Sequence, residues 1–252
     1  MGYLDRVYLR RPVPPDSYLS RLPAVRALAE RGEEGLSFSS PVTFLVGENG
    51  TGKSTLLEAI AVACGFNAEG GTRNFHFSTR DTHSPLCQAI TVARTDYPRD
   101  GFFFRAESFY NVATNIDEMD EEFSFGPPVI DSYGGVSLHE QSHGESFLAL
   151  VEHRFGGRGL YLLDEPEAAL SPTRMMSLLV LLHRLVEEHS QFVIATHSPI
   201  LMAYPGARIY QLSQQGIEPV AYRDTEHYQI TRRFLEAPER MLELLFEEDE
   251  EA

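Results

Sequence analysis

Short apolar runs and helical repeats alternate along the first part of the chain. Residues 3–10 and 41–47 are rich in β-branched and aromatic side chains, and the second run closes at a glycine, so both are predicted strands. Residues 24–30 follow a proline and show helical spacing. Residues 54–65 (STLLEAIAVACG) place apolar side chains three and four positions apart and end at Gly65, which predicts a helix directly after the second strand.

The same alternation returns in the later part of the chain. Apolar strands are predicted at residues 160–165 and 191–197. A predicted helix at 172–189 lies between them, with Ser171 placed to cap it and Pro172 at its first position. The order strand, helix, strand indicates a parallel sheet with crossover helices.

The middle of the chain, residues 66–136, has the least regular pattern. It contains two predicted strands, at 87–95 and 101–109, which a turn separates. From about residue 225 the pattern predicts two short amphipathic helices divided near Pro238, followed by an acidic tail that we expect to be solvated.

Together these elements predict an α/β fold with a mainly parallel central sheet, flanking helices and a small antiparallel β/helical lobe. We expect one domain over residues 1–252. Its core would comprise residues 1–65 and 136–225, its variable lobe residues 66–135, and its C-terminal helices residues 225–248.

Composition narrows the possible environments of the protein. The 252 residues are 42% hydrophobic, which is enough for a sizeable core. Because no run of about eighteen apolar residues and no apolar signal segment occurs, we expect a soluble, cytoplasmic protein without direct membrane insertion. Cys64 and Cys87 lie in apolar stretches without CxxC spacing, which favours free thiols over a disulfide or a metal site.

Charge narrows the possible partners. The formal net charge of -16 argues against a surface that binds nucleic acid non-specifically, although a local basic patch is compatible with it. Lys53 is the only lysine in the chain, and all the other Lys and Arg residues are arginine. Lysine is therefore retained at this one position of a chain that otherwise uses arginine.

The segment GENGTGKS fits the pattern GxxxxGK[ST] of a phosphate-binding loop at every fixed position. Glycines let backbone N–H groups approach the phosphates, a lysine reaches the β- and γ-phosphates, and a hydroxyl holds Mg²⁺. The loop lies between a predicted strand and a predicted helix whose N-terminus would face the negative charge. This context predicts a nucleotide phosphate site.

Acidic residues end the predicted strand LYLLDE. Asp164 stands where a Walker B aspartate holds Mg²⁺, at the carboxyl end of a strand beside the phosphate loop. Glu165 would point to the other side and orient the attacking water, although two acids at a strand end can also be merely solvated. His197 closes the next apolar strand and could reach the γ-phosphate, although a lone histidine is more often structural.

The stretch HEQSHGES fits two different patterns. As HExxH it would present His139 and His143 to zinc on one helix, with Glu140 as general base. That site needs a continuous helix and a third ligand, whereas Gly144 interrupts the stretch and GGVSL precedes it. The favoured interpretation is therefore a loop that enters a helix at about Ser142.

Four segments occur in an order shared with a known family. GENGTGKST, SHGES, LYLLDEPEAAL and ATHSP resemble, in order and rough spacing, the Walker A, signature, Walker B and switch-histidine motifs of ABC-type ATPases. The chain most resembles the soluble bacterial "predicted ATPase" or AAA family ATPase group, related to the SMC and RecF ATPase heads, over nearly its whole length. The resemblance implies a P-loop NTPase fold of the ABC-ATPase type.

By position, the resemblance assigns a role to each motif residue. It implies that Lys53 contacts the phosphates, that Ser54 and Asp164 hold Mg²⁺, that Glu165 is the catalytic base and that His197 is the switch residue. It also implies ATP and Mg²⁺ as cofactors in Mg²⁺-dependent ATP hydrolysis. The ATP-binding residues would be Gly47, Glu48, Asn49, Gly50, Thr51, Gly52, Lys53, Ser54 and Thr55.

The resemblance further implies an ATP-dependent homodimer, in which two subunits close head to tail around two ATP molecules. Each subunit would contribute a trans signature to the γ-phosphate held by the other. The trans signature residues would be Ser142, His143, Gly144 and Glu145.

The chain departs from the family pattern at several places. His143 and Glu145 stand where the commoner signature has Gly and Gln, and Ser171 stands near the D-loop position where an aspartate is usual. Glu107 is the candidate for the Q-loop position, with Gln88 as the alternative.

The sequence leaves the output of ATP hydrolysis open. A nucleic-acid-linked role in defence or repair would predict salt-dependent DNA binding. The alternatives are an ATPase subunit of a membrane transporter, with a protein partner still to be identified, and a nucleotide-gated binding module with negligible turnover. The presence of Glu165 speaks against the binding module.

Overall fold

The larger sheet of the protein has six strands in the order β5-β6-β7-β3-β8-β9. The computed structural model describes residues 2–73, 84–121 and 128–250. The first five strands run parallel and β9 pairs antiparallel to β8, so the predicted mainly parallel sheet is confirmed. In chain order the strands are β3 (Val42–Gly47), β5 (Asp100–Arg105), β6 (Gly159–Asp164), β7 (Gln191–Ala195), β8 (Arg208–Ser213) and β9 (Gly216–Val220).

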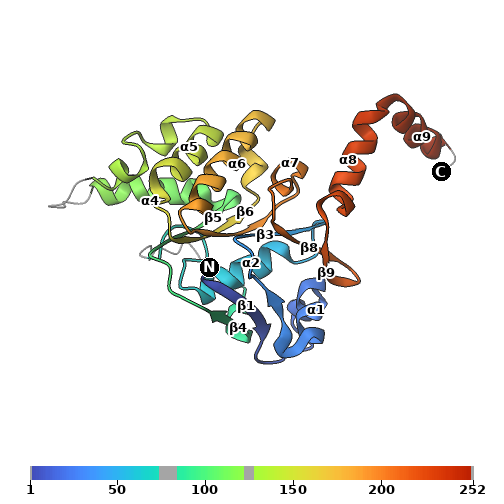
Figure 1. Ribbon diagram of the computed structural model, residues 1–252, viewed down its shortest axis with the longest axis horizontal. Helices are drawn as coiled ribbons and strands as arrows, with labels where there is room; N and C mark the ends of the chain where they lie inside the picture. Colours follow the sequence, from blue (N-terminus) through green and yellow to red (C-terminus); the bar gives the residue numbers. More distant parts are fainter. Residues whose placement is uncertain (1, 74–83, 122–127, 251–252) are drawn as a thin grey trace.

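Helices cover both faces of this sheet (Figure 1). One face carries α1 and α2, and the other carries α4, α5, α6 and α7 (Figure 1). Strands β3, β6 and β7 are therefore buried along their whole length, as expected of parallel strands between two helical layers. The helices are α1 (Pro23–Arg31), α2 (Lys53–Ala63), α4 (Phe109–Glu121), α5 (His143–Ala149), α6 (Pro172–Glu187) and α7 (Pro199–Met202).

The core is divided by the sheet into two clusters. Side chains of a strand alternate between faces, so Leu45 of β3 packs in the cluster with Leu57 of α2. Its neighbours Phe44 and Val46 pack in the other cluster, with Leu178 of α6. The apolar side chains of each central strand thus pack against helices on both faces of the sheet.

A smaller antiparallel sheet has the order β2-β1-β4 and confirms the predicted antiparallel part. Its strands are β1 (Leu4–Leu9), β2 (Leu36–Ser37) and β4 (Ile90–Arg94). The sheets do not follow the predicted division at residue 66. Strand β1, from the range expected to form the core, belongs to the small sheet, and β5, from the range expected to form the lobe, belongs to the large one.

Both predicted strands of the middle region were too long. Residues Leu86–Ala89 form the short helix α3, because Ser84 accepts a hydrogen bond from the Leu86 N–H and Pro85 precedes the first turn. Strand β5 ends at Arg105, where its pairing with β6 ends, and a 3-10 turn (Ala106–Ser108) then leads into α4.

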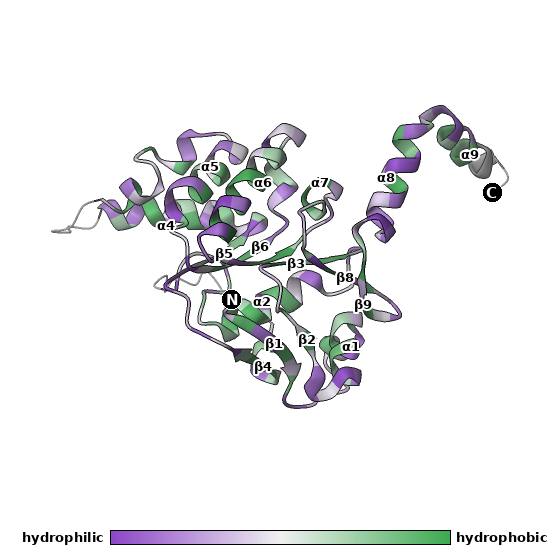
Figure 2. Cartoon of the chain, in the orientation of Figure 1, coloured by the Kyte–Doolittle hydropathy of each residue, from purple (hydrophilic) through white to green (hydrophobic). Residues whose placement is uncertain are grey.

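Two C-terminal helices meet near Pro238, as predicted: α8 (Glu226–Glu236) and α9 (Pro238–Glu250). They extend away from the layered body, and Figure 2 shows apolar patches along them. Their exposed apolar side chains include Leu235, Leu245 and Phe246. Within the described ranges, no helix combines the length and the apolarity that crossing a bilayer requires. The last two residues of the predicted acidic tail lie outside the described residues.

Candidate active site

The phosphate loop, Asp164, Glu165 and His197 come together at one edge of the large sheet, where parallel strands end. The phosphate loop follows β3, the Asp164–Glu165 pair ends β6, and His197 follows β7. Strands β3 and β6 both pair with β7, so these three strand ends are neighbours. In open α/β sheets, this carboxyl edge is where ligands bind.

Two positions of the phosphate loop require glycine. A Cβ added to Gly47, at φ 141°, would lie 2.1 Å from the Leu212 carbonyl oxygen of β8. Gly52, at φ 95°, is the N-cap of α2 in the left-handed region, which glycine adopts without steric cost. The loop therefore turns directly from strand to helix and presents the N-terminus of α2 to the site.

The other loop residues divide by exposure. Glu48, Asn49 and Gly50 are exposed, and Thr55 is half-buried on α2. Thr51 is buried and donates a hydrogen bond from its Oγ1 to the Glu48 carbonyl oxygen at 2.8 Å, which closes the loop on itself.

Lys53 is the first residue of α2 and is only 4% exposed. Its Nζ donates to the carbonyl oxygens of Gly47 at 2.6 Å and Glu48 at 3.0 Å. Burial lowers the pKa of the Lys53 ammonium, while the carboxylates of Glu165 and Asp164 act against this shift. The ammonium is thus held inside the loop, facing the acidic strand end.

The two predicted metal residues are in direct contact. Ser54 Oγ donates to Asp164 Oδ1 at 2.9 Å. Burial raises the pKa of Asp164 to about 6, whereas the Ser54 hydrogen bond and the charge of Arg105 favour the ionised form. A hydroxyl and a carboxylate at this spacing are oxygen ligands of the kind that Mg²⁺ takes, so these two side chains fit that ion.

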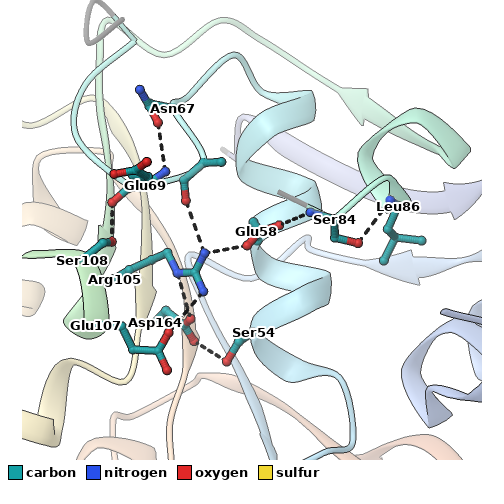
Figure 3. Close-up of polar contacts among 11 residues, drawn as sticks. Ser54, Glu58, Asn67, Glu69, Ser84, Leu86, Arg105, Glu107, Ser108 and Asp164 are labelled. Atoms are coloured by element: carbon teal, nitrogen blue, oxygen red, sulfur yellow. Dashed lines mark hydrogen bonds and ion pairs between the residues drawn. The ribbon is translucent and has the colours of Figure 1, made fainter. Parts of the chain in front are cut away.

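Arg105, at the end of β5, was not predicted from the sequence. It lies opposite Asp164 in the β5–β6 register, and its Nε is 3.8 Å from Asp164 Oδ2. Its Nη1 donates to Glu58 Oε2 at 2.5 Å, and Glu58 also accepts from the Ser84 N–H at 2.8 Å (Figure 3). Arg105 thus links α2 to the acidic end of β6.

Of the two Q-loop candidates, the structure places Glu107 near the site. Glu107 lies in the turn after β5, is 87% exposed and approaches Arg105 Nη2 with its Oε2 at 3.6 Å (Figure 3). Gln88 is an exposed residue of α3, which leads into β4 of the small sheet.

Glu165 and His197 face one another across the ends of β6 and β7. Glu165 takes the left-handed conformation (φ 50°, ψ 51°), and its N–H donates to the Ala195 carbonyl oxygen at 2.9 Å. Its Oε1 lies 3.7 Å from His197 Nε2, and its side chain is 41% exposed. Burial, followed by the nearby charges of Lys53 and His227, lowers the pKa of His197 to about 4. His197 is therefore neutral at neutral pH, with Nε2 toward an exposed carboxylate.

Two partners of His197 were missed in the sequence. Glu167, in the turn after Glu165, accepts from the His197 N–H at 2.5 Å, and burial raises the pKa of Glu167. His227, in the first turn of α8, lies with its Nε2 3.0 Å from His197 Nδ1. Glu167 was visible only as part of the acidic motif, and His227 lies 30 positions after His197, outside every motif.

The signature segment confirms the interpretation of a loop entering a helix. Ser142 is the N-cap of α5 and forms a capping box with Glu145. His139 lies before it in a separate 3-10 turn (Leu138–Glu140), and His143 is the first residue of α5. The two imidazoles of HExxH therefore do not share one helix, and the described residues contain no group of three or more side chains suited to a metal.

Packing fixes this segment against the chain that follows Glu165. Gly144 is buried, and a Cβ there would lie 2.7 Å from both the Ala169 carbonyl oxygen and Arg174 Nη1. Arg174 donates to Ser142 Oγ at 3.1 Å and to Glu145 Oε1 at 2.8 Å. Ser142, His143 and Glu145 stay exposed.

Arg174 belongs to the first turn of α6, which confirms the predicted cap. Ser171 is the N-cap residue, and its Oγ accepts from the Arg174 N–H at 3.4 Å. The candidate signature and the candidate D-loop position are therefore joined through one arginine.

Models of two families match the chain. An AAA domain matches residues 22–101, and an AAA domain described as putative AbiEii toxin, Type IV TA system, matches residues 129–203. The first match contains the phosphate loop, and the second contains the signature, Asp164, Glu165 and His197.

Similar proteins include ATP-binding subunits of transporters. The ribose import ATP-binding protein RbsA of Yersinia pestis is 28% identical over 208 residues, which are 74% of this chain but only 38% of that protein's length. A putative ABC transporter ATP-binding protein of Methanothermobacter thermautotrophicus is 26% identical over 244 residues, with 86% of this chain and 78% of that protein covered.

The fold has counterparts among solved structures. An ATP-binding cassette of an ABC transporter superposes with a TM-score of 0.50 at 15% identity, covering 86% of this chain and 90% of that chain. The arrangement of the motifs around one sheet edge agrees with the matches in sequence and fold, and the chain is similar to P-loop ATPases of the ABC type.

Proposed function

We propose that residues 1–252 act as a single ATPase domain that hydrolyses MgATP and closes as a head-to-tail homodimer around two nucleotides. The observation that carries the proposal is the 2.9 Å contact between Ser54 and Asp164. It brings the phosphate loop and the acidic strand end together at the edge that also holds Glu165 and His197.

Mg²⁺ would be held by Ser54 and Asp164. The bound ion would supply charge neutralisation at the transferred phosphoryl group. Arg105 supports this role from the protein side, because its positive charge keeps Asp164 more readily ionised despite burial.

The protein's own side chains supply the remaining chemistry. Lys53 contacts the β- and γ-phosphates, and the N-terminus of α2 faces their charge. Glu165 has an exposed carboxylate and accepts a proton from, or orients, the attacking water. His197 is neutral and offers a ring nitrogen to the γ-phosphate without adding a second positive charge beside Lys53.

The exposed face of the signature segment supports the dimer. Ser142 and His143 lie at the start of α5, and Gly144 lets this turn pack closely on Ala169. The capping box and Arg174 engage both Ser142 and Glu145 within their own chain, and they hold the exposed His143 and the N-terminus of α5 where a partner's nucleotide would approach.

The dimer is tested by the solution mass of the wild type and Glu165→Gln, measured by light scattering with and without MgATP. We expect hydrolysis by Glu165→Gln to fall by about 10² to 10⁴-fold, as for loss of a general base. This variant should become a dimer only with MgATP. Adding Ser142→Ala should restore the monomer, whereas adding Ser17→Ala, which removes the cap of an unrelated turn, should not.

If Glu165→Gln binds MgATP and stays monomeric, the homodimer is wrong. If instead wild-type turnover is negligible while nucleotide stays bound, the chain is a nucleotide-gated binding module.

We propose a nucleic-acid-linked role in defence or repair as the output of hydrolysis. The match to an AAA domain described as putative AbiEii toxin, Type IV TA system, supports this class. Turnover should rise on adding double-stranded DNA, and the rise should weaken steeply with salt. Turnover that does not respond to DNA at low salt would contradict the role.

The transporter alternative has its own support, because the similar proteins include a ribose import ATP-binding protein. In that case a membrane-protein partner would co-purify with the chain in detergent and stimulate turnover, while DNA would not.

A further inference from the structure

We propose that His227 is a positioning residue for ATP hydrolysis: it donates its Nε2–H to His197 Nδ1 and thereby keeps the His197 proton on Nε2, facing Glu165 and the γ-phosphate. This inference rests on the proposed function, because it gives His197 a place at the γ-phosphate. It adds to that function a residue from the C-terminal helix α8, outside all four motifs.

The two imidazoles are in direct contact. His197 Nδ1 and His227 Nε2 are 3.0 Å apart, and the rings meet edge to face at 61° with centroids 5.1 Å apart. The distance between the two nitrogens is that of a hydrogen bond. In a neutral histidine, the hydrogen bond at one ring nitrogen decides which nitrogen carries the proton.

Both rings are neutral, so the bond between them contains one proton. Burial and the charge of Lys53 lower the pKa of His197 and of His227. Two arrangements are then open, depending on which ring donates. They differ in what the two outer nitrogens, His197 Nε2 and His227 Nδ1, present to their surroundings.

The surroundings favour donation by His227. Among the described residues, His197 Nε2 and His227 Nδ1 are both buried without a hydrogen-bond partner. If His197 donated, its bare Nε2 lone pair would face the Glu165 carboxylate at 3.7 Å, and His227 would bury an unpaired N–H. If His227 donates, the N–H is on His197 Nε2 and faces that carboxylate at 3.7 Å, and the bare nitrogen is His227 Nδ1. Buried unpaired N–H groups are rare in proteins.

The same arrangement suits the nucleotide. Phosphate oxygens are acceptors, so a neutral imidazole can bind the γ-phosphate only through an N–H. His227 would therefore set His197 as a donor before ATP arrives, which removes the cost of choosing the tautomer in the complex.

The first turn of α8 is anchored well enough to hold His227 in place. Thr225, the N-cap, is fully buried, accepts from the Tyr228 N–H at 3.4 Å and donates to the Tyr222 carbonyl oxygen at 2.8 Å. The rings of Tyr222 and Tyr228, which flank Thr225 and His227 in the sequence, pack against each other with centroids 4.7 Å apart. His227 is thus fixed to the body of the protein although the rest of α8 extends from it.

Two substitutions distinguish the effect of the His227 hydrogen-bond donor from the effect of its side-chain volume. His227→Gln keeps an N–H donor at about the position of Nε2, and His227→Leu keeps bulk without a donor. We expect His227→Leu to lower kcat about 10- to 100-fold, since His197 then samples both tautomers and loses its fixed orientation. His227→Gln should stay within a few-fold of wild type. The dissociation constant of ATP should change little in either, and His183→Leu, at an exposed histidine of α6, should leave kcat unchanged.

The tautomer is measured directly on the wild-type chain by ¹⁵N NMR of histidine side chains, since a bare ring nitrogen resonates far downfield of a protonated one. We expect His197 to have a bare Nδ1 and a protonated Nε2, and to lose this single tautomer in His227→Leu. A protonated Nδ1 in the wild type would overturn the inference, as would wild-type kcat in His227→Leu. If His197→Ala alone hydrolyses ATP normally, the proposed role of His197 fails, while the NMR result still decides the contact with His227.

Discussion

Arg105 is the counter-charge of two buried acids at the site. It is 20% exposed and has three acids around it, of which Glu58 and Asp164 are nearly buried. A buried charge is costly when its partner is removed, because the remaining group keeps its desolvation penalty without compensation. Arg105 thus allows two carboxylates to be buried next to the phosphate loop.

We therefore predict that Arg105→Met lowers the free energy of unfolding by about 3 kcal/mol. The cost comes from Glu58 and Asp164, which are left buried without a counter-charge. Chemical denaturation measures it, and Glu58→Gln placed in the same chain should recover part of the loss. A matched Arg6→Met, at an exposed arginine that lies 4.0 Å from Asp5 and donates to the Glu33 carbonyl oxygen at 3.3 Å, should cost less than about 1 kcal/mol. Equal costs for the two variants would show that Arg105 is not the counter-charge.

Sequence and structure agree where a single segment determines its own form. The apolar runs that became β3, β6 and β7, and the loop GENGTGKS, carry their signals within a few residues of one another. Arg105, Glu167, Arg174 and His227 carry no such signal, because their partners lie in other elements and meet them only through the strand register or helix packing. The site could thus be located from the sequence, whereas the side chains that hold it in place could not.

At the scale of elements, the start of β5 is fixed by a second charged cluster. Asp100 Oδ2 accepts from the Gly156 N–H at 3.0 Å and the Tyr161 hydroxyl at 2.7 Å, and its Oδ1 accepts from Arg154 Nη1 at 2.9 Å. Burial acts to raise the pKa of Asp100, but these three donors outweigh it and the pKa is lowered. The cluster joins β5 and β6 to the π-helical segment Leu150–Arg154 that follows α5.

The direction of this shift predicts a pH dependence. Because the pKa of Asp100 is lower in the folded than in the unfolded chain, its contribution to stability is complete above the unfolded value of about 4 and is lost as pH falls through the folded value. Asp100→Asn should cost about 2 kcal/mol at pH 7. The difference from wild type in denaturation experiments should shrink as pH falls below about 4.

Asp5→Asn, at a half-buried aspartate that only approaches Arg6 at 4.0 Å with its side chain, serves as the control and should show little difference from wild type at any pH. A penalty for Asp100→Asn that stays constant down to acid pH would show that the charge of Asp100 is not what stabilises the cluster.

The capping of α5 explains why the signature segment has a glutamate at position 145. Glu145 accepts from both the N–H and the hydroxyl of Ser142 and pairs with Arg174, so the pKa of its carboxyl is lowered by these contacts. A glutamine could bond the backbone at this position but would not pair with Arg174 as a charge. The departure from the commoner signature thus has a structural reason within one chain.

At the scale of the whole molecule, the layered body and the two C-terminal helices differ in how much apolar surface they bury. Both core clusters lie on the sheet, and helix α9 packs on α8 with Leu244, Leu245 and Phe246 more than half exposed. The C-terminal pair therefore adds little to the core. Its first turn, by contrast, reaches His197.

We therefore predict different outcomes for two truncations. Removal of residues 238–252 should change the free energy of unfolding by less than about 1 kcal/mol, because the side chains that the structure describes in it, at residues 238–246, are mostly exposed. It should leave ATP turnover intact and reduce binding of an apolar dye. Removal of residues 225–252 should also take away His227 and lower turnover. Thermal melting measures the stability of the two truncated chains, and phosphate release measures their turnover. If removal of residues 238–252 abolishes folding, the C-terminal helices are part of the stable core and the prediction is wrong.

The burial of Lys53 in the phosphate loop has a chemical consequence for the chain as a whole. Since it is the only lysine, a reagent that acylates side-chain amines has one target in 252 residues, and that target lies where the phosphates bind. Its lowered pKa favours the nucleophilic free amine, while its 4% exposure restricts access. The extent of acylation therefore reports how often the loop opens, and a bound triphosphate would protect it. The protein carries its own single-site covalent reporter, without any engineered label.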